Sequence, residues 1–575
     1  MAATAGDVID IGNFATKLPQ WKASSITKPL YGLVDMGSNG IRFSISDLSP
    51  PRSRLLPCVY RERAAISLYD ALHESTPNSE PFHFSRETIV QVAQTLARFK
   101  SICNMYDVQK ENISVFATEA MRTAKNKDEM LFAIKESSGL AVDILSPGVE
   151  SLFGAMGARS GFQRVNGLFM DLGGGSVQMT YVNSTAEENY DVLAADAARS
   201  LPFGAAKLSM ALGSQNTAHA AKAELRARMR ETFEELTTRF PKLKKEAEQE
   251  DGITIYFCGG GFRGYGSMLM HTDPIQPYPI PVIGGYTVQG HRFIKWREML
   301  HANNHEGKVF GMSTRRRDQF PAIATVVQAI VEAVPKIKQV VFCSGGNREG
   351  VLYMKLPVQV RESNPLSFIL GEVMSGNDGI ASAVSIVISS GLANPYPALF
   401  SSQILQYVAS HTWLDMGNPD SSNSAKSLHN PISGLLAGIP GMTHETRAIL
   451  ALTMCARWGS DLAPGDKKLA DNLQSLIGHE LSWWCRYIGT IARLLALVVP
   501  TCPSSEQAID KALSLQASAS SCLGKKGHKA GIRLRINIRH AVCPGLNTEA
   551  IEGLFAKVGK NLQVNWKVEL DVVEL

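Results

Sequence analysis

Apolar and polar positions alternate along residues 29–147 in a way that predicts strands and helices in turn. Between residues 85 and 106, the apolar side chains recur at helical spacing, at Ile89, Val92, Leu96 and Phe99. A strand is expected to begin near Tyr31, and further strands are predicted at 113–116 and 142–145. A second helix is predicted between them, at 127–135. This alternation predicts an α/β domain. Residues 1–28 show no sustained period, and we interpret them as a tail.

The segment 148–358 repeats the alternation and predicts a second α/β domain. Its predicted strands lie at 167–170, 177–182, 254–257 and 340–343. A long helix is predicted at 221–240, where the apolar residues share one face and the charged residues occupy the other. We interpret that apolar face as core.

The pattern changes after residue 358. Helical spacing dominates 359–513, which predicts a helical domain, and its segment 418–427 is rich in Asn, Ser, Pro and Asp and is expected to be a loop. The Ser/Ala-rich and Gly/Lys-rich stretch 514–529 resembles a linker. Residues 530–575 alternate strictly at both ends, basic at Arg533 and Arg535 and acidic at Glu569 and Asp571, which predicts a small α+β module with paired strands.

Composition narrows the class of protein. The chain has 575 residues, of which 45% are hydrophobic and 19% charged, with a net charge of +5. These values are typical of a multidomain globular protein and do not favour nucleic-acid binding. The basic strand near Arg533 could contact RNA, but an acidic partner strand in the same module favours a structural role. Nine cysteines without a C-x-x-C pair indicate reduced thiols. With neither a signal-like N-terminus nor a membrane-length apolar run, we expect a cytoplasmic protein.

A weak internal repeat is the most informative feature. Leu33-Val-Asp-Met-Gly-Ser-Asn-Gly40 and Phe169-Met-Asp-Leu-Gly-Gly-Gly-Ser176 each lead an apolar strand through an aspartate into a glycine turn and a second alternating strand. Glycine lets the backbone approach a phosphate, and turn N–H groups and serine hydroxyls can donate to its oxygens. The aspartates Asp35 and Asp171 can hold Mg²⁺. A single such motif also fits a tight hairpin with an Asx turn. Two of them favour a phosphate site.

These motifs resemble the phosphate loops of the exopolyphosphatase/guanosine-pentaphosphate phosphatase (Ppx/GppA) family, within the actin, Hsp70 and sugar-kinase superfamily. Further family-like motifs follow in order across about residues 30–356, with a weaker helical match near 365–500; they begin at Ala117, Ser146, Ser200, Cys258, Arg316 and Arg348. The resemblance implies two actin-like (ribonuclease H-like) domains around a phosphate-binding cleft, followed by the helical domain and the small module.

The resemblance also implies roles for individual residues. Glu150 falls on the family's catalytic glutamate, and Asp171 is expected to assist catalysis and, with Asp35, to hold Mg²⁺. The expected phosphate-binding residues are Gly37, Ser38, Asn39, Arg42, Arg122, Gly173, Gly174, Gly175, Ser176, Gly259, Gly260 and Arg316. Glu119, although conspicuous in its motif, is interpreted as structural.

Two positions depart from the family pattern, and they leave two functions open. Gly148 and Gln178 stand where family members often carry polar or acidic side chains. Loss of carboxylates weakens water activation more than it weakens phosphate binding. The chain is therefore expected to be either a Mg²⁺-dependent hydrolase of phosphoanhydrides (polyphosphate, guanosine tetra- or pentaphosphate, or a nucleotide) or a non-catalytic sensor. A regulatory protein partner is expected, and a homodimer is an option.

Other phosphate-binding folds fit less well. Gly259, Gly261 and Gly264 satisfy G-x-G-x-x-G, but the acidic residue expected about 20 positions later in a dinucleotide site is missing. No G-x-x-x-x-G-K-[ST] occurs in the chain, which excludes a P-loop enzyme.

Overall fold

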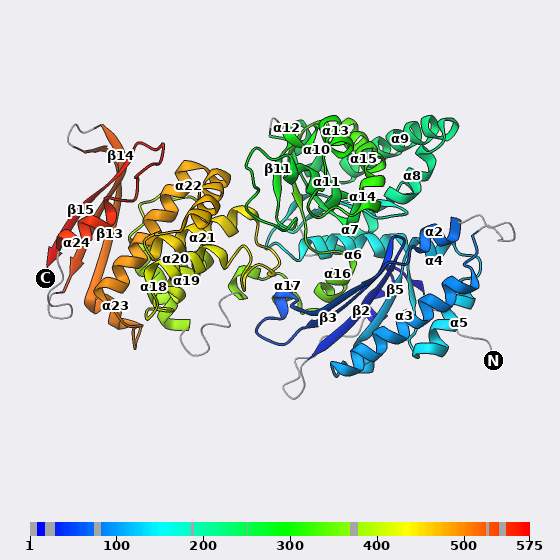
Figure 1. Ribbon diagram of the computed structural model, residues 1–575, viewed down its shortest axis with the longest axis horizontal. Coiled ribbons are helices and arrows are strands. Elements are labelled where there is room, and N and C mark those ends of the chain that lie inside the picture. The colour runs from blue at the N-terminus through cyan, green and yellow to red at the C-terminus, as the bar shows by residue number, and fades with distance from the viewer. Residues whose placement is uncertain are drawn as a thin grey trace. The chain divides into compact units, whose positions relative to one another are not determined.

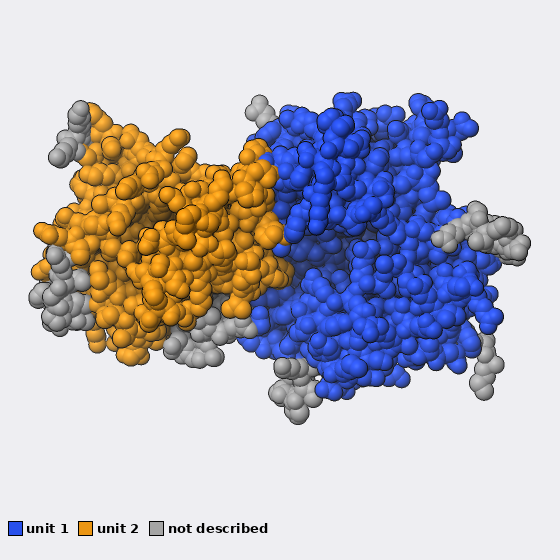
Figure 2. Space-filling model, in the orientation of Figure 1, with its two compact units in different colours: residues 1–273, 282–365 blue, residues 274–281, 366–575 orange. Residues whose placement is uncertain are grey.

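The computed structural model describes residues 8–17, 29–73, 82–185, 189–249, 251–368, 378–524, 528–539 and 548–574 (Figure 1). The chain divides into two compact units, which Figure 2 distinguishes by colour. Unit 1 comprises residues 1–273 and 282–365, and unit 2 comprises residues 274–281 and 366–575. In the part of the chain that the structure describes, no helix is long and apolar enough to span a membrane.

Unit 1 contains two six-stranded sheets built to one plan. The first has the order β1-β6-β5-β2-β3-β4 and the second the order β11-β12-β10-β7-β8-β9. In each, a long antiparallel hairpin, β2–β3 or β7–β8, pairs with a parallel neighbour on one side and an antiparallel edge strand on the other. This correspondence confirms that the two glycine motifs belong to related halves of an actin-like fold.

The strands of the first sheet are β1 (Val8–Ile9), β2 (Leu30–Gly37), β3 (Gly40–Asp47), β4 (Cys58–Ala64), β5 (Ile113–Ala117) and β6 (Asp143–Leu145). Those of the second are β7 (Asn166–Leu172), β8 (Val177–Asn183), β9 (Arg199–Leu201), β10 (Ile253–Cys258), β11 (Thr287–Gln289) and β12 (Ile337–Phe342).

Helices cover both sheets and complete the cores of the two halves. In the first half, α3 (Arg86–Met105) and α5 (Lys127–Ser138) pack against each other and against β2, β3 and β5 (Figure 1). In the second half, α6 (Pro147–Arg159) packs against α16 (Asn347–Lys355). Further helices of unit 1 are α2 (Leu68–His73), α4 (Glu119–Thr123), α7 (Tyr190–Ala197), α8 (Ala205–Leu212), α9 (Gln215–Arg239), α11 (Gly259–His271) and α14 (Thr314–Asp318).

The predicted N-terminal tail is wrong for residues 8–17. Strand β1 adds a parallel edge to β6, and Ile9 is buried in the core that contains α6. The ring of Phe14 meets the ring of Phe153 edge to face, with centroids 6.5 Å apart. A two-residue strand is too short to show a period, and its pairing partner lies far along the chain, so local pattern could not reveal it.

Unit 2 begins with a helical region, as the sequence predicts. Its main helices are α18 (Asp378–Ser390), α19 (Ser402–His411), α20 (Asp420–His429), α21 (His444–Arg457) and α22 (Pro464–Val498), which kinks at Gly478. The loop expected at 418–427 is wrong, because α20 occupies most of it. Polar residues of this helix are held by tertiary hydrogen bonds, such as that from the Asn423 amide to the carbonyl of Asp415.

The C-terminal sheet corrects one prediction and confirms another. The Ser/Ala-rich stretch expected to be a linker forms β13 (Leu513–Leu523), which pairs with β14 (Lys529–Ile538). Leu513, Leu515 and Leu523 are buried, because alternation rather than composition decides the structure here. Strand β14 lies parallel to β15 (Trp566–Glu574), and the structure places Arg533 opposite Glu569 and Arg535 opposite Asp571, as predicted. Residues 525–527 lie outside the described residues.

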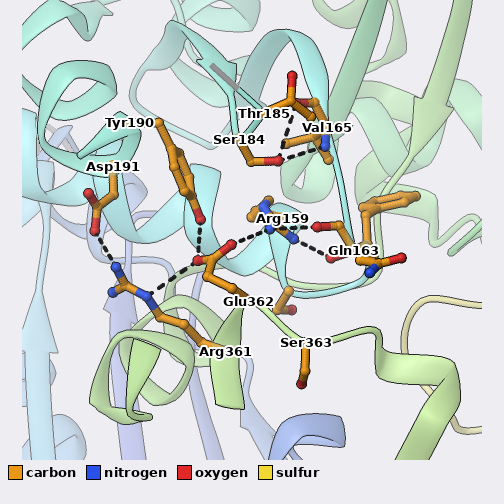
Figure 3. Close-up of polar contacts among 12 residues, drawn as sticks. Arg159, Gln163, Val165, Ser184, Thr185, Tyr190, Asp191, Arg361, Glu362 and Ser363 are labelled. Carbon is orange, nitrogen blue, oxygen red and sulfur yellow. Dashed lines mark hydrogen bonds and ion pairs between the residues drawn. The ribbon is translucent and has the colours of Figure 1, made fainter. Parts of the chain in front are cut away.

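A buried polar network ties the end of unit 1 to its core (Figure 3). Glu362 pairs with the fully buried guanidinium of Arg159, at 2.7 Å, and accepts a hydrogen bond from the Tyr190 hydroxyl, also at 2.7 Å. Arg361 pairs with Asp191 at 2.9 Å. These contacts explain why unit 1 continues to Pro365, beyond the boundary predicted at residue 358.

Candidate functional site

The two glycine motifs form the turns of the two central hairpins. In the first, Gly37 pairs with Gly40, so Ser38 and Asn39 alone make the turn between β2 and β3. In the second, a four-residue turn, 173–176, joins β7 and β8, and the Gly173 N–H donates to the carbonyl of Ser176 at 3.0 Å. Within the described residues, the backbone N–H groups of Ser38, Asn39, Gly174 and Gly175 have no acceptor.

The two turns contact each other. A Cβ atom at Gly174 would lie 2.7 Å from the Asn39 amide, and one at Gly175 would lie 3.1 Å from the Ser38 hydroxyl. Glycine is therefore required by the close approach of the two hairpins. The sequence motifs predicted the turns but not their contact.

The start of α8 fixes the second turn from behind. The N–H groups of Ala205 and Ala206 donate to the carbonyls of Gly173 and Gly174, both at 2.9 Å. A Cβ atom at Gly204 would lie only 2.3 Å from the Ser176 nitrogen. Gly204 ends the family-like motif that begins at Ser200, to which no role was assigned, and the structure shows that the second turn packs against it.

A third glycine turn closes the site at the start of α11. Gly259 has a φ of +82°, and a Cβ atom there would lie 2.1 Å from the Asp171 carboxylate. The guanidinium groups of Arg316 and Arg42 lie over Gly260, at 3.0 Å and 3.6 Å from the position that a Cβ atom would take. Position 259 therefore requires glycine, whereas a Cβ atom at position 260 would only crowd the end of the Arg316 side chain.

These elements enclose a cavity of about 110 Å³. Every predicted site residue except Arg122 lines it. The residues that the sequence analysis did not assign to the site are Gly40, Arg63, Thr118, Gln178, Gly261, Arg263, Ser313, Arg315, Gln319, Ile323, Gly346 and Asn347. They come from strands, helices and turns spread over residues 40–347, and only the fold brings them together.

Three carboxyl groups line the cavity. Burial raises the pKa of Glu150 to about 7, although Arg122 opposes the rise, and the nearby Asp171 and Asp35 add to it. Burial likewise raises the pKa of Asp35 and of Asp171, and the cation of Arg42 opposes both shifts. A carboxyl group with a pKa near 7 is suited to general base catalysis at neutral pH.

Positive charge exceeds negative charge around the same space. Five arginines line the cavity, at positions 42, 63, 263, 315 and 316, against the three carboxyl groups. Burial, together with the charges of Arg263, Arg42 and Arg63, lowers the pKa of Arg316 to about 10. Clustered cations that repel one another are stabilised by an anion of high charge.

Two residues make contacts other than those that the sequence predicted. Arg122, expected to bind phosphate, donates instead to Glu150 at 2.8 Å and to the carbonyl of Leu145 at 2.6 Å. Glu119, interpreted as structural, lies against the second turn: a Cβ atom at Gly175 would collide with its carboxylate. The Oε2 atom of Glu119 is buried and has no hydrogen-bond partner among the described residues.

The two departures from the family pattern have structural explanations. A side chain at Gly148 would meet Ile11, at 3.0 Å, so the N-terminal segment occupies that space. The buried Gln178 amide donates to the Ser176 hydroxyl at 2.6 Å and to Ser200 at 3.3 Å. A carboxylate could not donate these bonds, and Gln178 therefore braces the second turn.

The donors present fit a hydrated Mg²⁺ ion. No three His, Cys, Asp or Glu side chains of the described chain form a ready-made metal cluster. Mg²⁺, however, keeps several waters and is commonly held by one or two carboxylates together with substrate phosphates. Asp35 is buried and Asp171 is partly buried, the charge of Asp171 destabilises that of Asp35, and the unpartnered Oδ1 of Asn347 lies in the same cavity. These are groups that a divalent cation would stabilise.

Comparison with known proteins gives relatives of two kinds. Retrograde regulation protein 2 of Saccharomyces cerevisiae is 31% identical over 490 residues, which cover 83% of this chain and 82% of that protein. A bifunctional 3-dehydroquinate synthase/phosphatase of Fusobacterium nucleatum is 24% identical over 155 residues, 26% of this chain and 22% of the relative.

Solved structures include an exopolyphosphatase from Cytophaga hutchinsonii, with 19% identity, coverage of 56% of this chain and 96% of that chain, and a TM-score of 0.43. A Ppx/GppA phosphatase of Aquifex aeolicus has 18% identity, coverage of 57% and 99%, and a TM-score of 0.41. The model of the Ppx/GppA phosphatase family matches residues 48–359, and that of the RTG2 C-terminal domain matches residues 378–573. With more than half of its length matched by the first model, this chain belongs to the Ppx/GppA phosphatase family.

Proposed function

We propose that this protein binds a polyphosphate-type ligand, either inorganic polyphosphate or a nucleotide polyphosphate, and hydrolyses it slowly while reporting its occupancy in mitochondria-to-nucleus retrograde signalling. The observation that carries the proposal is the excess of arginine around two opposed turns whose N–H groups lack acceptors. An array of N–H groups and guanidinium forks is suited to a chain of phosphoryl oxygens.

Each group has a role in this proposal. Glu150 accepts a proton from the attacking water, because its pKa near 7 leaves much of it ionised and basic at neutral pH. Asp35 and Asp171 would hold Mg²⁺, which supplies positive charge to the transferring phosphoryl group. Arg42 and Arg316, both over Gly260, bind phosphoryl oxygens from one side. The turn N–H groups of Ser38 and Gly174 bind them from the other.

We expect turnover to be slow because a carboxylate is missing next to the second turn, at position 178. Gln178 fills with an amide the place where family members often carry a glutamate, and its N–H groups serve Ser176 and Ser200. Binding contacts remain while one potential activating carboxylate is absent, so occupancy outlasts each catalytic event. The signalling role is suggested by the name of the yeast relative. A partner would recognise the occupied form in proportion to the ligand's preference for that form.

One experiment distinguishes the slow hydrolase from the alternative, a non-catalytic sensor that acts only through partner proteins. Glu150→Gln should abolish phosphate release from polyphosphate or a nucleoside triphosphate while leaving affinity within a few-fold. Gly174→Val, which places side-chain bulk against Asn39, should abolish binding. Affinity by calorimetry, phosphate release and a cellular retrograde-signalling assay are measured for both.

If the wild type binds and signals but releases no phosphate, the sensor alternative holds and the hydrolase part fails. If Glu150→Gln binds normally but does not signal, hydrolysis itself is the signal. If neither class of compound binds the wild type, the whole proposal is wrong.

A further inference from the structure

Unit 2 contains a second cavity, of about 220 Å³, which is separate from the site described above. Three segments enclose it: the end of α21 with the turn after it, the middle of α22, and the turn that follows α24 (Thr548–Phe555). Its lining residues are Ala456, Gly459, Ser460, Arg486, Thr490, Arg493, Leu554, Lys557, Val558, Lys560 and Asn561.

The charged residues that line this cavity are all cationic. Four of the lining residues are cationic, Arg486, Arg493, Lys557 and Lys560, and none is a carboxylate. The ends of α21 and α24 also face this region, and each helix C-terminus carries about half a negative charge. Asp420, at 3.3 Å from Arg493, supplies one full negative charge. The charge of Asp471 also acts on Arg486, where it opposes the lowering of the arginine's pKa by burial, and it supplies a second full negative charge. Together these offset about three of the four cations, so the cavity stays positive.

The two arginines are held in place by the fold. Arg486 donates to the carbonyl of Lys560 at 2.6 Å, which fixes the turn after α24, and to the side chain of Gln474 at 3.1 Å, which fixes the guanidinium itself. The guanidinium of Arg493 packs against Gly459, where a Cβ atom would lie 2.7 Å from it. The cavity wall is therefore rigid on the α21 and α22 side, which favours binding because little order must be imposed.

The two lysines that line the cavity, Lys557 and Lys560, are not held by ion pairs to any described residue. Within the described residues, no carboxylate lies within ion-pair distance of the Lys557 or Lys560 ammonium group. Both side chains belong to the turn that Arg486 anchors, so their stems begin at the rim of the cavity. Hydroxyls of Ser460 and Thr490 and the amide of Asn561 add neutral hydrogen-bonding groups, and Ala456, Leu554 and Val558 form an apolar wall.

We propose that this cavity is a second ligand site, specific for a small anion that carries a phosphate group. Clustered cations with hydroxyl and amide donors recognise phosphoryl oxygens, and the apolar wall accommodates a short organic moiety. A volume of about 220 Å³ holds a phosphorylated metabolite of a few carbon atoms or a short inorganic phosphate, but not a nucleic acid strand. The protein thus has two phosphate-responsive sites, one in each unit.

The test measures each lysine separately on the full chain. An amine-reactive reagent modifies the protein with and without the probe, pyrophosphate or glycerol 3-phosphate, at matched ionic strength, and peptide mass spectrometry gives the rate at each lysine. Either probe should slow modification of Lys557 and Lys560 at least about threefold. Lys467 and Lys468, exposed residues on α22 outside the cavity, serve as internal controls and should not change.

A variant provides the second measurement. Lys557→Gln/Lys560→Gln should lose one of two classes of pyrophosphate-binding sites in calorimetry, whereas Lys467→Gln/Lys468→Gln should keep both. Protection by glycerol 3-phosphate as well as pyrophosphate identifies a phosphorylated metabolite as the ligand, and protection by pyrophosphate alone identifies an inorganic phosphate. Equal slowing at all four lysines, or none at any of them, overturns the proposal. Because the labelling uses the wild-type chain, a failure of the variant to fold does not affect that result.

Discussion

The Arg122 guanidinium lies 2.8 Å from the Glu150 carboxylate, and it is the cation that opposes the burial of this carboxyl group. Both side chains are largely buried, so the ion pair acts in a medium of low dielectric. Arg122 therefore lowers the proton affinity that burial gives Glu150, and it does not itself line the cavity.

This relationship predicts the pH dependence of phosphate release. Glu150 must be deprotonated to act as a base, so the rate should rise with pH through about 7, the pKa raised by burial. Arg122→Met removes the charge that lowers this pKa, and the inflection should move upward by about one pH unit or more. A pH–rate profile of both proteins measures the shift. An inflection that stays in place would show that Arg122 does not control Glu150.

The proposed role of Asp171 as a Mg²⁺ ligand predicts that ligand binding depends on the metal. Asp171→Asn should weaken Mg²⁺-dependent ligand binding by at least ~10-fold, about 1.4 kcal/mol, because the neutral amide is a poorer ligand for a hard cation. Calorimetry with Mg²⁺ and with EDTA compares the two proteins. Equal affinity of the wild type under both conditions would remove the premise that Asp35 and Asp171 hold the metal.

Replacing Gly204 by alanine, which adds a single methyl group, should weaken ligand binding. A Cβ atom at this position would lie 2.3 Å from the Ser176 nitrogen and 2.4 Å from the Gly174 carbonyl oxygen, so Gly204→Ala must displace the second turn. We expect ligand affinity to fall about 10-fold or more and stability to fall by about 1–3 kcal/mol. The matched control is Gly465→Ala, where a Cβ atom has no neighbour within 4 Å. Loss of affinity in both variants would point to a global effect of replacing glycine.

The network at the end of unit 1 predicts a stability difference between two ion pairs. Glu362→Ala leaves the fully buried Arg159 without its carboxylate partner, which should lower the free energy of unfolding of unit 1 by about 3 kcal/mol. Glu235→Ala breaks a pair with Arg199 in which both side chains are nearly half exposed, and it should cost at most about 1 kcal/mol. Chemical denaturation followed by circular dichroism compares them. Equal losses would mean that the buried pair contributes no more than a surface pair.

Local pattern determined much of this protein. The spacing of apolar residues predicted α3, β5, β7 and β8, because each is an element whose own side chains form one side of a core. The repeated glycine motifs predicted both turns of the site, since turn chemistry is local. The alternating charges near Arg533 and Glu569 also predicted their pairing, because registered strands place opposite charges face to face.

Only the tertiary structure decided which residues meet. Strand β1 exists because β6 offers a free edge, and β13 exists because β14 does, although neither segment's composition indicates a strand. Arg122, which the sequence predicted to bind phosphate, forms an ion pair with Glu150. Arg63, Arg263 and Arg315 line the cavity, although no local sequence pattern indicated that they would. Hydrophobic periodicity reports which side of an element is buried. It carries no information on which distant side chain lies opposite, and the pKa of Glu150 depends on those distant groups.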